Sequence, residues 1–272
     1  MPPPRRGGPP PAGVRAAYGL TAEPVPLPGG FHGAWRVGPA AMKRLDVPEA
    51  TLVWLAGLLD RLDGRADLRV TPVLRTSAGA LSAAGWFAWR FEDGSSGAGR
   101  WAEIVAAGRA LHAALAGEPR PAFLDIRDDP WAVADRLAWG EADPADWSGA
   151  PLLGEILPAL PAPGGSGQLV HGDLTGNVLF ADGLPPLIID LSPCWRPPGF
   201  AAAVVVVDAL AWHSADLALA QEFPEVTPEL VLRALVFRVA AHHQLAGGRW
   251  SAADVARHRR VLAALGAGSA AG

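Results

Sequence analysis

The chain has 272 residues, of which 50% are hydrophobic and 18% are charged, and its formal net charge at pH 7 is −4. A chain of this length can bury the core of one large domain or of two lobes, and its hydrophobic content excludes an intrinsically disordered protein. Its slightly acidic balance argues against broad neutralisation of nucleic-acid phosphates, so we expect no nucleic-acid partner. The single cysteine, Cys194, cannot form an internal disulfide, which is typical of a reducing cytoplasm.

The two ends of the chain and its most apolar stretch bear on its location. Residues 1–13 are rich in proline and glycine and lack the hydrophobic run of a secretory signal. Residues 200–212 are the most apolar stretch, but they contain Asp208 and are too few to cross a bilayer. We therefore expect a cytoplasmic protein with no membrane partner and with disordered tails at residues 1–20 and 266–272.

Residues 21–92 are predicted to form a small β-rich lobe. Segments typical of short strands cover residues 34–37, 40–45, 68–74 and 85–91. A helix is predicted over residues 48–62, because leucines recur there at helical spacing and Pro48 suits a first turn. The polar, glycine-rich residues 92–99 follow, and they indicate a boundary between lobes.

Residues 93–265 are predicted to form a larger, mainly helical lobe. Helices are expected over residues 101–116, 228–246 and 251–265, with a shorter one that ends near Leu160. An aspartate- and proline-rich stretch, residues 118–151, lies between the first of these and the short helix. A hairpin that carries the most informative residues of the chain interrupts the helical pattern after residue 167.

The first predicted strand of this hairpin, residues 168–170, leads into the segment His171-Gly172-Asp173-Leu174-Thr175-Gly176-Asn177. The second, residues 186–189, ends on Asp190. The oxygen-bearing side chains of Asp173, Asn177 and Asp190 suit a hard cation such as Mg²⁺, which needs few protein ligands when substrate phosphates and water complete its shell. Taken alone, Asp173 is more typical of a turn residue after a strand, and the alternative for Asp190 is that it caps the following loop.

This segment resembles the catalytic segment of the aminoglycoside phosphotransferase family, the small-molecule branch of the protein-kinase-like superfamily. It is most similar to a group that carries Leu-Thr-Gly-Asn after His-Gly-Asp. The resemblance implies an α+β, protein-kinase-like two-lobe fold with a β-rich N-lobe and a mainly helical C-lobe. It also implies ATP or GTP as phosphoryl donor, Mg²⁺ as cofactor, Asp173 as catalytic base, and Asn177 and Asp190 as metal ligands.

Neighbouring residues receive supporting roles. We expect His171 to orient the loop through a backbone hydrogen bond and Gly172 to supply a backbone angle that other residues resist. The resemblance implies that Asp208 braces the catalytic loop through backbone hydrogen bonds, whereas the residue pattern alone also suits a helix cap. Arg196 could bind a phosphate or an acidic substrate, or form a surface salt bridge.

In the N-lobe, Lys43 lies on the expected third strand, where the resemblance implies a contact with the α- and β-phosphates; the alternative is an ordinary edge lysine. Its usual partner is a helix glutamate, and neither Glu49 nor Asp60 is well placed for that role. Gly29, Gly30 and Gly33 precede the next strand and could cover the phosphates with backbone N–H groups, although a plain hairpin explains them equally well.

One departure from the family pattern concerns the loop itself. Asp173 and Asn177 are four residues apart, whereas five is usual in the family. Either Gly176 lets the loop close more tightly, or Thr175 takes part, or the metal site is altered. Two functions therefore remain: Mg²⁺-dependent transfer of a γ-phosphoryl group to a hydroxyl of a small molecule, or a pseudo-kinase that binds nucleotide or a protein partner. Acidic residues between 125 and 146 either attract a cationic acceptor or form a solvated face.

Overall fold

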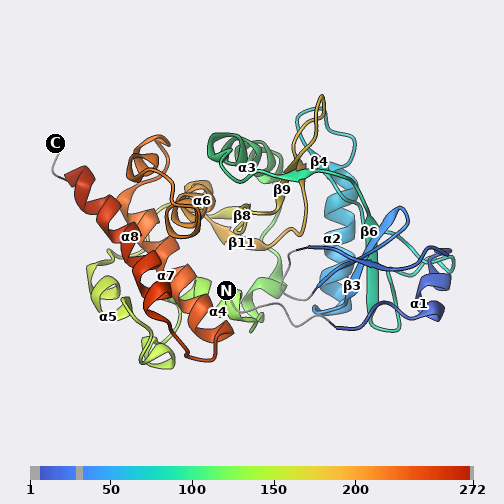
Figure 1. Ribbon diagram of the computed structural model, residues 1–272, viewed down its shortest axis with the longest axis horizontal. Helices are drawn as coiled ribbons and strands as arrows, with labels where there is room; N and C mark the ends of the chain where they lie inside the picture. Colours follow the sequence, from blue (N-terminus) through green and yellow to red (C-terminus); the bar gives the residue numbers. More distant parts are fainter. Residues whose placement is uncertain (1–6, 29–32, 270–272) are drawn as a thin grey trace. The chain divides into compact units, whose positions relative to one another are not determined.

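The computed structural model describes residues 7–28 and 33–269, without the side chains of 266–269. The chain forms two compact units, each described separately below (Figure 1). The N-terminal unit comprises Pro2–Ser95 and Phe180–Ile189, and the C-terminal unit comprises Ser96–Leu179 and Asp190–Gly272. The short strands β7 (Ser95–Ser96) and β9 (Val178–Phe180) lie where the chain passes from one unit to the other.

The N-terminal unit is built on a five-stranded antiparallel sheet. In sheet order, its strands are β1 (Val25–Pro26), β2 (Trp35–Val37), β3 (Ala40–Arg44), β6 (Trp86–Arg90) and β5 (Ser82–Ala83). The central pair is β3 and β6, with Lys43 opposite Phe87. Met42 and Trp86, which are 0% and 2% exposed, are the largest side chains of the core cluster in this unit. The expected strands at residues 34–37, 40–45 and 85–91 thus correspond to β2, β3 and β6.

Part of the expected N-terminal tail is folded. Residues 12–17 form α1 (Ala12–Ala17), and Val14 joins the core cluster with an exposed fraction of 5%. The hydroxyl of Tyr18 donates hydrogen bonds to the carbonyl oxygens of Leu81 (3.0 Å) and Trp86 (3.3 Å). The expectation of disorder up to residue 20 was therefore wrong from residue 12 onward. The segment is too short to show the apolar spacing of a helix, and it is held in place by the contacts of Val14 and Tyr18 with distant residues.

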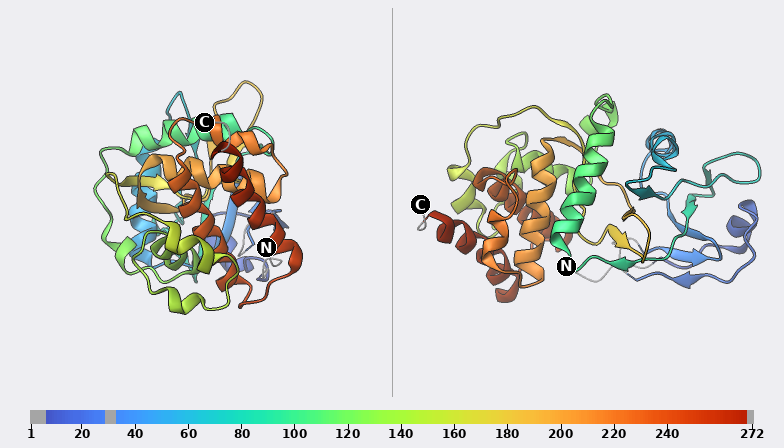
Figure 2. Two further views of the ribbon diagram at one scale, coloured as in Figure 1. Left: turned by 90° about the vertical axis from the view of Figure 1, so that its left-hand side faces the viewer. Right: turned by 90° about the horizontal axis from the view of Figure 1, so that it is seen from above.

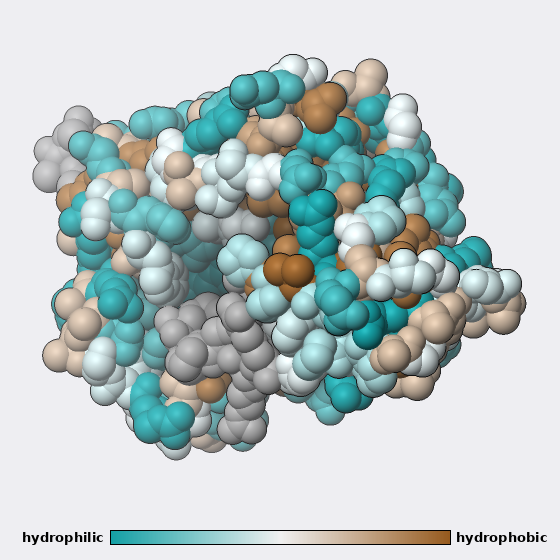
Figure 3. Space-filling model, turned by 45° about the vertical axis from the view of Figure 1, so that its right-hand side comes forward, coloured by the Kyte–Doolittle hydropathy of each residue, from teal (hydrophilic) through white to brown (hydrophobic). Residues whose placement is uncertain are grey.

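The helix α2 (Glu49–Leu62) follows β3, as its leucine spacing predicts, and buries Leu52, Ala56, Leu58, Leu59 and Leu62. The expected strand at residues 68–74 is reduced to β4 (Arg69–Val70), because Pro72 has no N–H group to donate. The strand β4 pairs in parallel with β10 (Leu187–Ile188), which is why residues 180–189 belong to this unit. Most of the surface shown in Figure 3 is hydrophilic, and the exposed large apolar side chains of the described chain are Val25, Val53, Ile126 and Leu184.

The C-terminal unit is mainly helical. Its α-helices are α3 (Trp101–Leu115), α4 (Pro130–Ala138), α5 (Leu153–Ile156), α6 (Pro198–Trp212), α7 (Pro228–Leu245) and α8 (Ala252–Ser269). Short 3-10 helices, η1 (Ala122–Asp125), η2 (Pro144–Trp147), η3 (Leu157–Ala159) and η4 (Leu217–Gln221), connect them. The helix α6 packs against α3, α7 and α8, and nearly all of its residues are buried, which explains the apolar run at 200–212 (Figure 2). Among the described helices, none has the length and apolar character required to span a membrane.

One two-stranded antiparallel ribbon is embedded among these helices. The strand β8 (Gln168–His171) pairs with β11 (Pro193–Arg196), so that His171 lies opposite Pro193 and Gln168 opposite Arg196. The sequence predicted a hairpin between residues 168–170 and 186–189, and this pairing was wrong. Leu187 and Ile188 pair with β4 instead, and the chain reaches the partner of β8 only after Asp190.

Candidate active site

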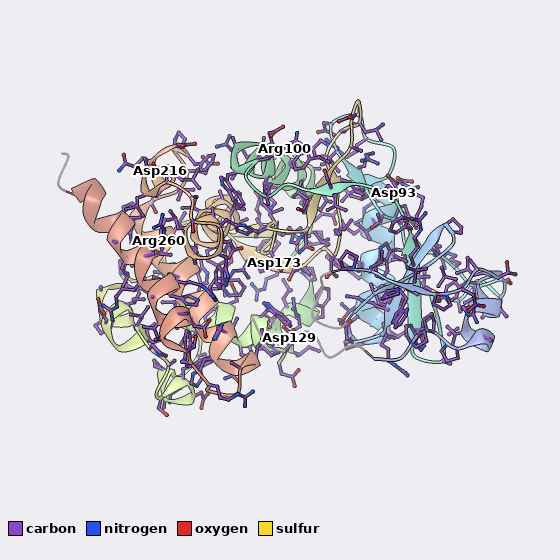
Figure 4. All side chains as sticks on the ribbon, viewed as in Figure 1. Asp93, Arg100, Asp129, Asp173, Asp216 and Arg260 are labelled. Atoms are coloured by element: carbon purple, nitrogen blue, oxygen red, sulfur yellow. The ribbon has the colours of Figure 1, made fainter. Side chains whose placement is uncertain are left out.

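The ribbon brings two distant segments to the same place. Because β8 and β11 are antiparallel, the residues that follow His171 and those that precede Pro193 leave the same end of the ribbon. The backbone N–H of Gly172 donates a hydrogen bond of 2.9 Å to the carbonyl oxygen of Ser192. Asp173, which is labelled in Figure 4, therefore begins its loop beside the segment that carries Asp190.

The imidazole of His171 ties these two segments together. Its Nδ1 accepts hydrogen bonds from the backbone N–H groups of Asp173 (3.2 Å) and Ser192 (3.3 Å). A nitrogen that accepts carries no proton, so the ring proton of His171 lies on Nε2. The expectation that His171 orients the loop through a backbone hydrogen bond is confirmed.

A second histidine supports the first. The backbone N–H of His171 donates to Nε2 of His112 on α3, at 3.1 Å. Burial, followed by the neighbouring His171, lowers the pKa of His112 to about 3, so this ring is neutral and able to accept. The sequence contained no signal for this contact, because the two residues are 59 positions apart.

Two glycines shape the loop, in different ways. Gly172 does not have a positive φ, so the expectation of a special backbone angle was wrong; a Cβ at this position would lie 3.0 Å from Sγ of Cys194, and close packing explains the glycine. Gly176 does have a positive φ, +84°, within a turn closed by a hydrogen bond of 3.0 Å from the Asn177 N–H to the Leu174 carbonyl. This turn accounts for the shortened spacing between Asp173 and Asn177.

The side chain of Asn177 folds back onto Asp173. Its Nδ2 donates to the carbonyl oxygen of Asp173 at 2.8 Å and lies 3.4 Å from Oδ2 of the same residue. Because the amide nitrogen is used in this way, the amide oxygen of Asn177 is the atom that a hard cation could bind. The tight turn thus retains the donor that the proposed metal needs.

Asp190 has an unusual backbone. It is exposed and has a φ of +45°, in the left-handed region that few residues other than glycine adopt, although aspartate tolerates it better than most. Strained backbone of this kind is often found at functional sites. The described chain contains no cluster of three or more His, Cys, Asp or Glu residues suited to a metal. A carboxylate and an amide oxygen, completed by water and phosphate, nevertheless suit Mg²⁺.

Arg238 on α7 makes a contact that sequence reasoning missed. Its Nη2 donates to Oδ1 of Asp173 at 2.6 Å, while its Nε and Nη2 donate to the two carboxylate oxygens of Asp208 at 2.8 and 2.5 Å. Burial opposes the charge of Arg238, but Asp208 and Asp173 outweigh burial and raise its pKa. Asp208 lies within α6 rather than at its end. It therefore does not cap a helix, and the loop contact it supports runs through the Arg238 side chain rather than through backbone hydrogen bonds.

The predicted nucleotide-binding residues belong to the N-terminal unit. Lys43 lies on β3, with Nζ 3.8 Å from Oδ2 of Asp46 and 5.6 Å from the centre of the Phe87 ring. The carboxylate of Glu49 accepts a hydrogen bond from the Ser82 hydroxyl, at 3.0 Å to Oε2. Gly33 has a φ of +68°, as a tight turn requires, whereas Gly29 and Gly30 lie outside the described residues.

A cavity of about 110 Å³ within the C-terminal unit adjoins the loop, with Gly172, Ser192 and Cys194 in its lining. A second cavity, of about 220 Å³, shares four lining residues with it, namely Arg120, Glu141, Trp195 and Arg196. Arg196 is 8% exposed and forms bidentate ion pairs with both Asp135 and Glu141. The salt-bridge alternative for Arg196 is therefore confirmed, although the guanidinium itself is buried, and Arg196 is not a free phosphate ligand.

The acidic stretch between residues 125 and 146 is partly neutralised by arginines. Its ion pairs are Asp125 with Arg120, Asp129 with Arg127, and both Asp135 and Glu141 with Arg196. Asp129, labelled in Figure 4, also caps α4 by accepting from the backbone N–H groups of Trp131 and Ala132. Arginines thus engage four of the seven carboxylates of this stretch, and the other three, Asp128, Asp143 and Asp146, are exposed.

Comparisons with known proteins place this arrangement in a fold. No protein-family model matches the chain, and no curated protein sequence matches it. Solved structures do match. An aminoglycoside phosphotransferase from Alicyclobacillus acidocaldarius is 16% identical, with a TM-score of 0.56 over 95% of this chain and 96% of that one.

Two ligand-bound kinases are similar in the same way. An amicoumacin kinase in complex with AMP-PNP, Ca²⁺ and its substrate is 12% identical, with a TM-score of 0.63 over 91% of this chain and 90% of that one. A spectinomycin phosphotransferase in complex with ADP and spectinomycin is 13% identical, with a TM-score of 0.53 over 91% of both chains. The chain thus has the α+β, protein-kinase-like fold of aminoglycoside phosphotransferases and related small-molecule kinases, as the sequence motif predicted.

Proposed function

We propose that this protein is a phosphotransferase that moves the γ-phosphoryl group of ATP or GTP to a hydroxyl group of a small molecule, with Mg²⁺ as cofactor. The observation that carries the proposal is the meeting of the loop of Asp173 and Asn177 with the segment of Asp190, joined through the His171 imidazole, in a small-molecule kinase fold. Solved relatives of this fold hold ADP or AMP-PNP, which supports a nucleotide as donor.

In this reaction the acceptor oxygen forms a bond to the γ-phosphorus, the bond from the γ-phosphorus to the bridging oxygen breaks, and the nucleoside diphosphate leaves. The hydroxyl proton passes to the Asp173 carboxylate. Positioning and charge stabilisation dominate phosphoryl transfer, so a fixed carboxylate is more important than a strongly basic one. Asn177 and Asp190 would hold the Mg²⁺, which when bound would supply positive charge at the phosphates of the nucleotide.

The remaining roles follow from chemistry and position. Lys43 would bind the α- and β-phosphates through its ammonium group, and the turn at Gly33 would cover the phosphates with the glycines that precede it. The cavity beside Gly172 and Ser192, together with the second cavity that adjoins it at Arg196, is the proposed place for the acceptor. Their aromatic and arginine-rich walls, which include Trp131 and Trp195, suit a small organic molecule.

Thermal unfolding with ATP or GTP, each with and without Mg²⁺, tests the donor and the metal. A nucleotide at about 100 times its Kd stabilises the folded state by about 2.7 kcal/mol and raises Tm by several degrees. We expect a rise that needs Mg²⁺, persists in Asp173→Asn and is lost in Asp190→Ala. Release of phosphate should then be slower in Asp173→Asn.

Three results would speak against the proposal. If neither nucleotide changes the Tm, both the phosphotransferase and a nucleotide-holding pseudo-kinase are excluded. If a nucleotide raises the Tm without any metal and no phosphate is transferred to water or to a panel of hydroxyl compounds, the pseudo-kinase is supported. If Asp173→Asn releases phosphate at the wild-type rate, Asp173 is not the base.

A further inference from the structure

We propose that Arg238 is a positioning residue that fixes the carboxylate of Asp173 for proton acceptance, and that Asp208 holds Arg238 for this task. The inference rests on the proposed phosphotransferase function. It assigns a role to α7, which lies 65 residues beyond Asp173 in the chain.

The hydrogen-bond geometry divides the guanidinium between the two carboxylates. Asp208 receives the Nε and one Nη2 hydrogen, in a side-on pair at 2.8 and 2.5 Å. The second Nη2 hydrogen is directed to Oδ1 of Asp173 at 2.6 Å. Two hydrogen bonds to the buried Asp208 anchor Arg238. The third hydrogen bond, to Asp173, therefore holds that carboxylate at a defined position.

The other side of Asp173 is also held. Nδ2 of Asn177 bonds to the Asp173 carbonyl oxygen at 2.8 Å, and the Asp173 N–H bonds to His171. Oδ1 is engaged by Arg238, whereas Oδ2 has only the longer approach of 3.4 Å from Asn177. We therefore assign Oδ2 to the acceptor hydroxyl. Because Arg238 binds Oδ1, it fixes the orientation of the carboxylate and with it the direction of Oδ2.

Charge and exposure support this assignment. The side chain of Asp208 is 8% exposed and that of Arg238 is 12% exposed, so these two neutralise each other in the interior. Asp173 is 30% exposed and brings an additional carboxylate to the same guanidinium. The group of three therefore contains one more carboxylate than guanidinium, and the more exposed of the two carboxylates is that of Asp173.

A second buried arginine on the same helix provides a matched control. Arg233 is 1% exposed and donates to Glu229 (2.8 Å) and to the carbonyl oxygens of Ala138 (2.8 Å) and Pro161 (2.6 Å). It clamps α7 in the same manner as Arg238 does, but its hydrogen bonds go to no residue of the 171–177 loop. Both Arg233→Met and Arg238→Met remove the hydrogen bonds of a buried arginine on α7, but only Arg238→Met removes the contact with Asp173.

The experiment measures release of phosphate from ATP with Mg²⁺, with water as acceptor, and ADP affinity by calorimetry. We expect Arg238→Met to lower kcat by about 10- to 100-fold, since small misplacements of a reacting group have effects of this size. The Kd for ADP should change by less than about twofold, because the lost contact acts on the chemical step. Arg238→Lys should recover part of the rate, and Asp208→Asn should lower it in the same direction. Arg233→Met should lower Tm but leave kcat near the wild-type value.

A double variant tests whether Arg238 acts through Asp173. If it does, Arg238→Met adds no further loss of kcat in an Asp173→Asn background. Additive losses, or a wild-type kcat in Arg238→Met, would overturn the inference while leaving the phosphotransferase intact. A wild-type protein that neither binds ADP nor releases phosphate would overturn the proposed function and this inference together. Should Arg238→Met not fold, the same comparison is made with Arg238→Lys and Asp208→Asn, and wild-type rates in both would overturn the inference.

Discussion

His112 on α3 accepts a hydrogen bond of 3.1 Å at Nε2 from the backbone N–H of His171, the last residue of β8. Both residues are buried, with exposed fractions of 4% and 0%. One residue further on, the chain enters the loop of the proposed catalytic base. The helix α3 thus supports the start of this loop through a neutral imidazole.

We expect His112→Leu to lower the free energy of unfolding by about 1–3 kcal/mol, because the buried N–H of His171 loses its acceptor. Urea denaturation followed by circular dichroism measures the change. His112→Gln offers an amide oxygen in place of the imidazole nitrogen and should lose less. If both variants are as stable as the wild-type protein, the hydrogen bond contributes little to stability.

Acid should destabilise the protein through its buried histidines. Burial lowers the pKa of His112 to about 3 and that of His258 to about 4, whereas an unfolded histidine titrates near its ordinary value of 6.5. Below that value the unfolded chain binds protons that the folded chain does not, so stability is present above about pH 6.5 and falls as the pH decreases. At one pH unit below 6.5, each such histidine lowers the free energy of unfolding by about 1.4 kcal/mol.

The measurement is Tm between pH 8 and pH 5, where most carboxylates of both states remain charged. His258→Phe keeps an aromatic ring beside Trp212 and Trp250 and should reduce the slope below pH 6.5. His213 is exposed, and His213→Gln is the control that should retain the slope. A Tm that does not fall between pH 6.5 and pH 5 would contradict the prediction.

Gly108 on α3 is expected to control the position of the active-site loop. A Cβ at this residue would lie 2.5 Å from Cδ1 of Leu174, the buried neighbour of Asp173. Gly108→Ala should therefore displace the loop and lower the phosphate-release rate by about 10-fold or more, since small misplacements of a reacting group are costly.

Gly57 on α2 is the matched helical control for this substitution. A Cβ there would meet only the flexible end of Arg61, at 3.7 Å. Gly57→Ala should raise stability by up to about 1 kcal/mol through helix propensity and leave the rate unchanged. Equal rates in the two variants would show that Leu174 adjusts without moving Asp173.

Arg196 should be essential for the stability of the C-terminal unit. Removing it leaves Asp135, whose side chain is 15% exposed, without the guanidinium that binds both of its oxygens. We expect Arg196→Met to cost about 3–5 kcal/mol in chemical denaturation, the usual penalty for leaving a buried charge unpaired. The double variant Arg196→Met with Asp135→Leu should recover part of the loss, and no recovery would argue against an electrostatic cause.

Several elements could be predicted because their signals are local. The leucine spacing of residues 48–62 and the apolar face of residues 101–116 each predict a helix from neighbours three and four positions apart, and α2 and α3 have nearly these bounds. In the same way, the short segment from His171 to Asn177 contains its own loop, turn and backbone hydrogen bonds. The resemblance of this segment to a known catalytic segment made the kinase-like fold predictable from a small part of the chain.

Contacts between distant residues were not predictable in this way. The pairing of β8 with β11, the helix α1 against the N-terminal sheet, and the contact of Arg238 with Asp173 and Asp208 all depend on segments that meet only after folding. The residues around Arg238 form an ordinary apolar helix with no sign of its partners, which lie 30 and 65 residues away. The sequence by itself determined helices such as α2, α3 and α7 and the motif that resembles a kinase catalytic segment, because these depend on neighbours along the chain. Only the tertiary structure decided which arginine holds the proposed base, because a buried charge acquires its partner when α6 and α7 pack together.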